Sequence, residues 1–206
     1  MLKYLSLFFT FILLQMQGGE TKFLLLSGPS GAGKSTIIRE LQRIDSRFIY
    51  IKPFTTRLLR DGEIDKISVP LEKILELQAE NKLIALNHIY ENYYATPLEP
   101  ILESLDANLF PVIDWPIDKV ENLKALLGDK VICMFLFLEE DELKERLQLD
   151  GRDSSGIRFS AGTKELELFL NGSFSHVIDY TIKNHQGDAL RSAETIYEKY
   201  LKSLAL

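Results

Sequence analysis

A glycine-rich stretch near the N-terminus strongly restricts the folds that this chain can adopt. It reads Gly28-Pro29-Ser30-Gly31-Ala32-Gly33-Lys34-Ser35-Thr36, and from Gly28 to Ser35 it fits the phosphate-binding pattern G-x-x-x-x-G-K-[ST]. The apolar residues 22–27 before it predict a short buried strand, and residues 35–44 after it repeat apolar side chains at the spacing of one helical face. A strand, a glycine loop and a helix in this order are the context in which the pattern binds phosphate.

Each residue type in this phosphate loop, residues 28–36, has a physical reason to be there. Glycines let the backbone turn successive N–H groups toward a phosphate, and no side chain blocks the approach. The helix that follows adds the positive end of its dipole. Lys34 is expected to reach the β- and γ-phosphates of ATP as a catalytic residue, and the Ser35 hydroxyl is expected to bind Mg²⁺. The whole loop is the predicted ATP-binding element.

Composition narrows the function classes without choosing one. The chain has 206 residues, of which 46% are hydrophobic and 26% charged, as in one ordinary globular domain. A net charge of −6 argues against a general nucleic-acid binder but leaves room for a local basic site that takes a small phosphorylated ligand. A single cysteine, Cys133, excludes a disulfide framework. The three histidines, His88, His176 and His185, lack the spacing of metal ligands.

Residues 1–16 form an apolar extension ahead of the predicted domain. A signal peptide would carry more positive charge than Lys3 and a small-residue cleavage site, and a membrane anchor would need about 20 apolar residues. A third interpretation is that the reading frame starts upstream of the true start, Met16, and leaves a dispensable tail. We favour the third, because an ATP-binding loop belongs in the cytoplasm, and we place a membrane tether of a cytoplasmic enzyme second.

The rest of the chain alternates predicted strands and helices. Further strands are expected at 47–51, 83–90, 109–114, 131–138 and 177–182, and further helices after Pro70, around 101–105, and at 117–127, 139–149, 164–170 and 188–203. Residues 52–63 and 150–156 read as loops and 92–96 as a turn. Alternation of this kind predicts an α/β fold with a central parallel sheet covered by helices on both faces.

A second polar pattern lies in the predicted loop after residue 51. It reads Thr55-Thr56-Arg57-Leu58-Leu59-Arg60-Asp61-Gly62-Glu63. Two arginines three residues apart are able to hold one phosphate together, because each guanidinium offers a planar pair of donors and keeps its charge. A solvated loop with two surface arginines is the alternative.

Taken together, these stretches resemble the guanylate kinase family, a group of P-loop nucleoside monophosphate kinases. The loop is similar to GPSGxGKST and residues 55–63 to TTRxxRxGE. In the same order, 92–96 resembles NYYGT, 113–115 resembles IDWQG, 145–152 resembles RLxxRG, 157–166 resembles IxxRLxxAxxEL and 179–184 resembles DYVIVN. The resemblance covers residues 22–203, and it is the shared order of the motifs that makes it specific.

The resemblance implies a role for each matching residue. Arg57, Arg60 and Tyr94 would bind the acceptor phosphate, and Thr96 and Asp114 would lie near the acceptor base. Arg152 and Arg158 would act with Lys34 as catalytic residues that close on the transferred phosphoryl group. Asn184 would lie near the adenine of ATP. Residues 20–206 would form one guanylate kinase-like domain, with an acceptor-binding part at about 50–97 and a short lid at about 149–162.

Departures from the family pattern concentrate in the acceptor site. Pro53 and Ala85 stand where the family has a serine and a glutamate that read guanine, and Val112 replaces an acidic residue. The segment after Glu63 is shortened and lacks the family's phosphate-binding tyrosine, with Lys66 in that region. The lid is also shorter than usual.

Three functions follow as alternatives. The first is transfer of a phosphoryl group from ATP to GMP, the second is the same chemistry on another phosphorylated acceptor, and the third is a non-catalytic binding module of the same fold. The expected cofactors are ATP and Mg²⁺, and the expected partners are small nucleotides, with neither nucleic acid nor a stable membrane partner. We expect a cytoplasmic monomer or weak homodimer.

Overall fold

The computed structural model describes residues 21–205 apart from 90, 152, 154–155 and 185–186. Its strands are β1 (Phe23–Ser27), β2 (Phe48–Tyr50), β3 (Phe54–Thr55), β4 (Ile67–Ser68), β5 (Leu83–Ile89), β6 (Asn92–Pro97), β7 (Phe110–Asp114), β8 (Val131–Phe137) and β9 (Tyr180–Lys183). Its α-helices are α2 (Lys34–Ile44), α3 (Leu71–Ala79), α4 (Glu99–Asp106), α5 (Val120–Leu127), α6 (Glu140–Asp150), α7 (Ile157–Leu170) and α8 (Ala189–Leu204), with 3₁₀ helices η2 (Ile117–Lys119) and η3 (Gly128–Lys130).

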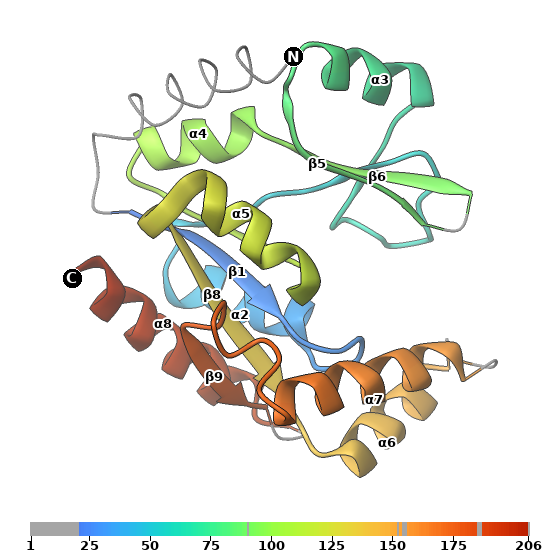
Figure 1. Cartoon of the computed structure of the whole chain (residues 1–206), viewed down its shortest axis with the longest axis vertical. Helices are drawn as coiled ribbons and strands as arrows, with labels where there is room; N and C mark the ends of the chain where they lie inside the picture. The colour runs from blue at the N-terminus through green and yellow to red at the C-terminus, as the bar shows by residue number, and fades with distance from the viewer. Residues whose placement is uncertain (1–20, 90, 152, 154–155, 185–186, 206) are drawn as a thin grey trace.

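Five strands form the central sheet in the order β2-β7-β1-β8-β9, and all of its strand pairs are parallel. The predicted α/β architecture is therefore confirmed. Parallel neighbours need crossover connections, which the helices supply on the two faces. Figure 1 shows α5 in front of this sheet and α2 behind it; residues of α4 share a core with α5 and residues of α8 share one with α2.

Strand β1 divides its side chains between two hydrophobic cores. Leu24 and Leu26 pack with α2 and α8 on one face, whereas Phe23 and Leu25 pack with α4 and α5 on the other. Successive residues of a strand point to opposite faces, so a strand covered on both faces reads as one apolar run. All five residues of β1 are buried. The phosphate loop therefore follows a strand that is buried along its whole length.

A smaller, four-stranded sheet in the order β4-β3-β6-β5 lies beside α3 (Figure 1). The expected turn at 92–96 is wrong, because these residues belong to β6, which pairs antiparallel with β5 and β3. The reversal comes earlier, next to Glu91, whose φ is 45°. Tyrosine and threonine favour extended backbone, and here that preference outweighs the turn tendency of Asn92.

The helical hairpin of α6 and α7 forms the opposite end of the molecule (Figure 1). Helix α7 begins at Ile157, earlier than the predicted 164, because the Asp153 carboxylate accepts hydrogen bonds from the backbone N–H groups of Arg158 and Phe159 at 2.9 and 2.8 Å. The last strand is Tyr180–Lys183 rather than 177–182. The interpretations of residues 1–16 lie outside the described residues. None of the described helices is long and apolar enough to cross a bilayer.

Candidate active site

The phosphate loop connects β1 to α2, as its pattern predicts. Gly28 has a φ of +130°, and a Cβ there would lie 2.2 Å from the main-chain oxygen of Leu136 in the neighbouring strand. Gly33 has a φ of +94°, and a Cβ there would lie 2.6 Å from the Asn184 amide nitrogen. Both positions therefore require glycine. Within the described chain no side chain caps the first turn of α2, although the Thr36 N–H donates to the Gly33 main-chain oxygen at 3.1 Å, so the N–H groups that precede it are the ones open to an anion.

Lys34 lies at the start of α2 and turns back into its own loop. Its Nζ donates hydrogen bonds to the main-chain oxygens of Gly28 and Pro29 at 2.5 and 3.0 Å. Burial lowers the pKa of this ammonium below its ordinary value, while the negative charges of Asp114 and Glu165 act in the opposite direction. The cation is thus held beside the loop by two main-chain oxygens.

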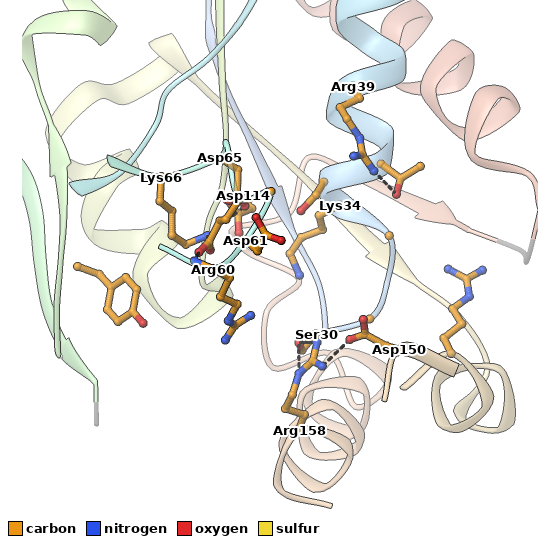
Figure 2. A pocket seen from close by; sticks show the side chains of 18 of the residues that line it. Ser30, Lys34, Arg39, Arg60, Asp61, Asp65, Lys66, Asp114, Asp150 and Arg158 are labelled. Atoms are coloured by element: carbon orange, nitrogen blue, oxygen red, sulfur yellow. Dashed lines mark hydrogen bonds and ion pairs between the residues drawn. The ribbon is translucent and has the colours of Figure 1, made fainter. Parts of the chain in front are cut away.

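Helix α7 supports the loop through residues on one face, spaced by four and three. The Arg158 Nε and Nη2 donate to the Ser30 hydroxyl at 3.1 and 2.8 Å, and its Nη1 donates to Asp150 at 2.7 Å (Figure 2). One turn further, Gly162 passes so close that a Cβ would lie 3.3 Å from the Pro29 Cβ. Burial raises the pKa of the Glu165 carboxyl, one turn further on, while the Lys34 charge and the Gly28 backbone act in the opposite direction.

The second half of the site lies on the small sheet. Arg57 follows β3, and its two terminal nitrogens donate to the two carboxylate oxygens of Glu63. Glu63 also accepts the Arg60 backbone N–H at 2.9 Å. Its hydrogen bonds to Arg57 hold the pKa of Glu63 at about 2, while Glu63 and Tyr94 raise the pKa of Arg57. The loop of Arg57 and Arg60 is therefore built around the Glu63 carboxylate, whose side chain is only 11% exposed.

Asp114 ends β7, directly beside β1. The Tyr50 hydroxyl donates to its Oδ1 at 2.8 Å, and the pKa of Tyr50 is raised by burial and then by the charge of Asp114. Thr96, also predicted near the acceptor base, is buried on β6 opposite Ala85 and is absent from the lining of the described cavity. Tyr50 orients Asp114, and its role had no signal in the sequence.

One cavity of about 730 Å³ brings the two halves together. Its lining includes, among the predicted residues, Ser30, Gly31, Gly33, Lys34, Ser35, Thr36, Arg57, Arg60, Tyr94, Asp114 and Arg158. In Figure 2, Lys34 lies between the loop and a group formed by Arg60, Asp61, Asp65, Lys66 and Asp114. Among the described residues, seven basic and five acidic side chains line this cavity, whereas the whole chain carries a charge of −6. The site is a local basic region in an acidic protein, which favours polyanionic ligands.

Asn184 lies behind the phosphate loop. Its amide is buried, donates to the Ala32 main-chain oxygen at 2.6 Å and accepts from the Ser192 hydroxyl at 2.9 Å. Arg146 adds a second support by donating to the main-chain oxygen of Asn184 at 2.7 Å. These contacts hold the loop, and a place for Asn184 near adenine stays a prediction. Arg152, the other predicted catalytic arginine, lies outside the described residues.

The parallel sheet, the glycine loop and the lysine that follows it are those of a P-loop kinase. The guanylate kinase family model matches residues 20–198. Guanylate kinases of Streptococcus pneumoniae (strain R6) and Clostridioides difficile (strain 630) are both 29% identical to the chain, over 79% and 84% of it and 79% and 83% of their own lengths. A crystal structure of guanylate kinase from Anaplasma phagocytophilum superposes with a TM-score of 0.69 at 19% identity, covering 91% of this chain and 88% of that one. The chain belongs to the guanylate kinase family.

Proposed function

We propose that the chain is an ATP-dependent kinase that transfers the γ-phosphoryl group of ATP to GMP. The observation that carries the proposal is the single cavity shared by two phosphate-binding groups, the loop with Lys34 on one wall and Arg57, Arg60 and Tyr94 on the other. Two phosphates held at facing walls of one basic cavity are positioned for direct transfer between them. The family of the chain supports GMP as the acceptor.

One group of residues in the cavity would bind the donor, ATP, and another would bind the acceptor nucleotide. Loop residues 28–36 would hold the phosphates of ATP, with Lys34 leaving the Gly28 and Pro29 oxygens to meet them. Arg158, already over Ser30, would stabilise the charge that develops during transfer, together with Arg152. The exposed Ser35 hydroxyl lines the cavity at the first turn of α2, which suits a Mg²⁺ ion that would neutralise phosphate charge.

On the acceptor side, Arg57, Arg60 and Tyr94 would bind the GMP phosphate, and Asp114 would accept hydrogen bonds from the base. An unpaired donor supports this assignment: the Arg57 Nε is buried and has no hydrogen-bond partner among the described residues. Thr96 would lie near the acceptor base together with Asp114. The proposal includes the acceptor part at about 50–97, the lid at about 149–162, a cytoplasmic location, and a monomer or weak homodimer.

Mg²⁺-dependent ADP formation, measured with the full chain and a panel of nucleoside monophosphates, tests the proposal. We expect turnover with GMP and at least about tenfold less with AMP, CMP or UMP. Lys34→Met should lower kcat by about 100-fold or more, because one charged donor to the transferred group is lost. Lys73→Met is the matched control, since Lys73 is half exposed on α3 and pairs with Glu76. A folded chain that turns over no monophosphate would contradict the proposal.

A further inference from the structure

Lys66 lines the same cavity, although the family pattern assigns it no role. Its side chain is 20% exposed, and its Nζ lies 3.0 Å from an Asp65 oxygen and 3.6 Å from the Glu63 Oε1. Figure 2 shows Lys66 and Arg60 within one group of charged residues in the cavity, beside Asp61 and Asp65. Lys66 is thus a partly buried cation that faces the cavity with its charge paired to carboxylates.

The charge balance of the acceptor wall gives Lys66 a function. Glu63 binds Arg57 through both carboxylate oxygens, so this pair carries no net charge toward a ligand. A nucleotide monophosphate brings a charge of about −1.5 to −2 near neutral pH. The other two cations of this wall are Arg60 and Lys66, and Lys66 is paired with Asp65 at 3.0 Å, so its charge balances the phosphate only when that pair loosens.

The contacts of Lys66 with its partners allow its ammonium to turn toward a bound phosphate. The Asp65 side chain is 35% exposed, so its ion pair with Lys66 is partly solvated and costs little free energy to break. An ammonium has three donors, of which Asp65 accepts one at 3.0 Å, while Glu63 lies 3.6 Å away as an ion-pair partner. Glu63 is itself held by Arg57 and by the Arg60 backbone, and it keeps Lys66 within reach of the arginines.

We propose that Lys66 is a further acceptor-binding residue, whose ammonium contacts the phosphate of the acceptor nucleotide beside Arg60. It supplies charge in a shortened segment that has no tyrosine between Glu63 and Ser68. This inference rests on the proposed function and identifies how the same site takes up the acceptor. A cation in place of a neutral hydroxyl makes acceptor binding more dependent on salt and on the ionisation of the phosphate.

The test compares Lys66→Met with Lys66→Arg in the full chain. We expect Lys66→Met to raise the KM for GMP about tenfold or more, as for the loss of a charged hydrogen bond, and to leave the KM for ATP within about twofold. Lys66→Arg keeps the charge and should recover most of the loss. Raising the salt concentration should increase the KM for GMP more steeply in the unsubstituted chain than in Lys66→Met. Lys73→Met should behave as the unsubstituted chain.

Two competitive inhibitors separate a phosphate contact from a structural role. Inorganic phosphate should inhibit Lys66→Met more weakly than the unsubstituted chain, whereas guanosine, which has no phosphate, should inhibit both equally. Equal weakening of both inhibitors, or an unchanged KM for GMP, would overturn the inference while leaving the proposed function intact. If the unsubstituted chain does not phosphorylate GMP, calorimetric titration with the monophosphate panel replaces kinetics. Equal affinities for the two chains then overturn the inference, and the absence of binding overturns both proposals.

Discussion

Replacing Asn184 with alanine tests whether this residue holds the phosphate loop or reads a base. The change removes the bond to the Ala32 oxygen at 2.6 Å and the acceptor of the buried Ser192 hydroxyl at 2.9 Å. Arg146 Nη1 still lies 3.4 Å from the Ala32 oxygen, so that loss is partly covered and costs about 1 kcal/mol. The Ser192 hydroxyl, left without an acceptor, adds about 1–3 kcal/mol.

We therefore expect Asn184→Ala to lower the free energy of unfolding by roughly 2–4 kcal/mol. For a chain of this size the melting temperature should fall by roughly 4–16 °C. Urea unfolding and scanning calorimetry measure both quantities. The KM for ATP should rise as well, because the loop loses a support directly behind Gly33, where a Cβ would lie 2.6 Å from the Asn184 amide.

Two further variants sharpen this measurement. Asn171→Ala is the matched control, since Asn171 also bonds a serine, Ser173, but is exposed, and its loss should cost less than about 0.5 kcal/mol. Ser192→Ala combined with Asn184→Ala should cost less than the sum of the single changes, because both remove the same bond. An Asn184→Ala protein that keeps its melting temperature but loses its preference for ATP over GTP would refute this reasoning and favour a contact with adenine.

Two more predictions concern the phosphate loop and the Glu63 carboxylate. Gly28→Ala should cost about 3 kcal/mol or more in unfolding free energy, because its Cβ would lie 2.2 Å from a backbone oxygen; Gly172→Ala, also at positive φ but with nothing within 4 Å, should cost about 1 kcal/mol. Similar losses in thermal unfolding would contradict the argument from close approach. Glu63 has a lowered pKa of about 2, so its stabilisation is complete above about pH 5 and is lost as pH falls toward 2. The free energy of unfolding of Glu63→Gln should fall by about 3 kcal/mol less between about pH 5 and pH 2 than that of the unsubstituted chain. Urea unfolding at several pH values measures this, and an equal fall for the two chains would contradict the prediction.

The donor half of the site was predictable because it is local in sequence. Strand, loop and helix are consecutive, and the loop residues that meet the cavity, such as Lys34 and Ser35, lie within one turn of each other. Hydrophobic periodicity also predicted the parallel sheet. It failed where two local preferences compete, as at Asn92, and where a helix start depends on a side chain from the preceding loop, as at Asp153.

The acceptor half depends on contacts between segments far apart in the chain. The Asp114 carboxylate accepts the Tyr50 hydroxyl across 64 positions. Long-range contacts also support the donor half, where Arg158 donates to Ser30 across 128 positions. Motif spacing says nothing about such pairs. It likewise could not show that Asn184 lies behind the loop or that Thr96 is buried and absent from the lining of the cavity, since both facts follow from how distant elements pack.

The burial of all five residues of β1 gives the two halves of the site different local stability. The phosphate loop is joined to a strand at the centre of both cores, so its opening free energy should approach that of global unfolding. The acceptor arginines instead follow β3, a strand of two residues whose neighbour β4 has both residues exposed, with Ile67 at 42%. Amide hydrogen exchange should therefore be slow in the donor half and fast in the acceptor half, and the motion that admits and releases nucleotide should arise on the acceptor side.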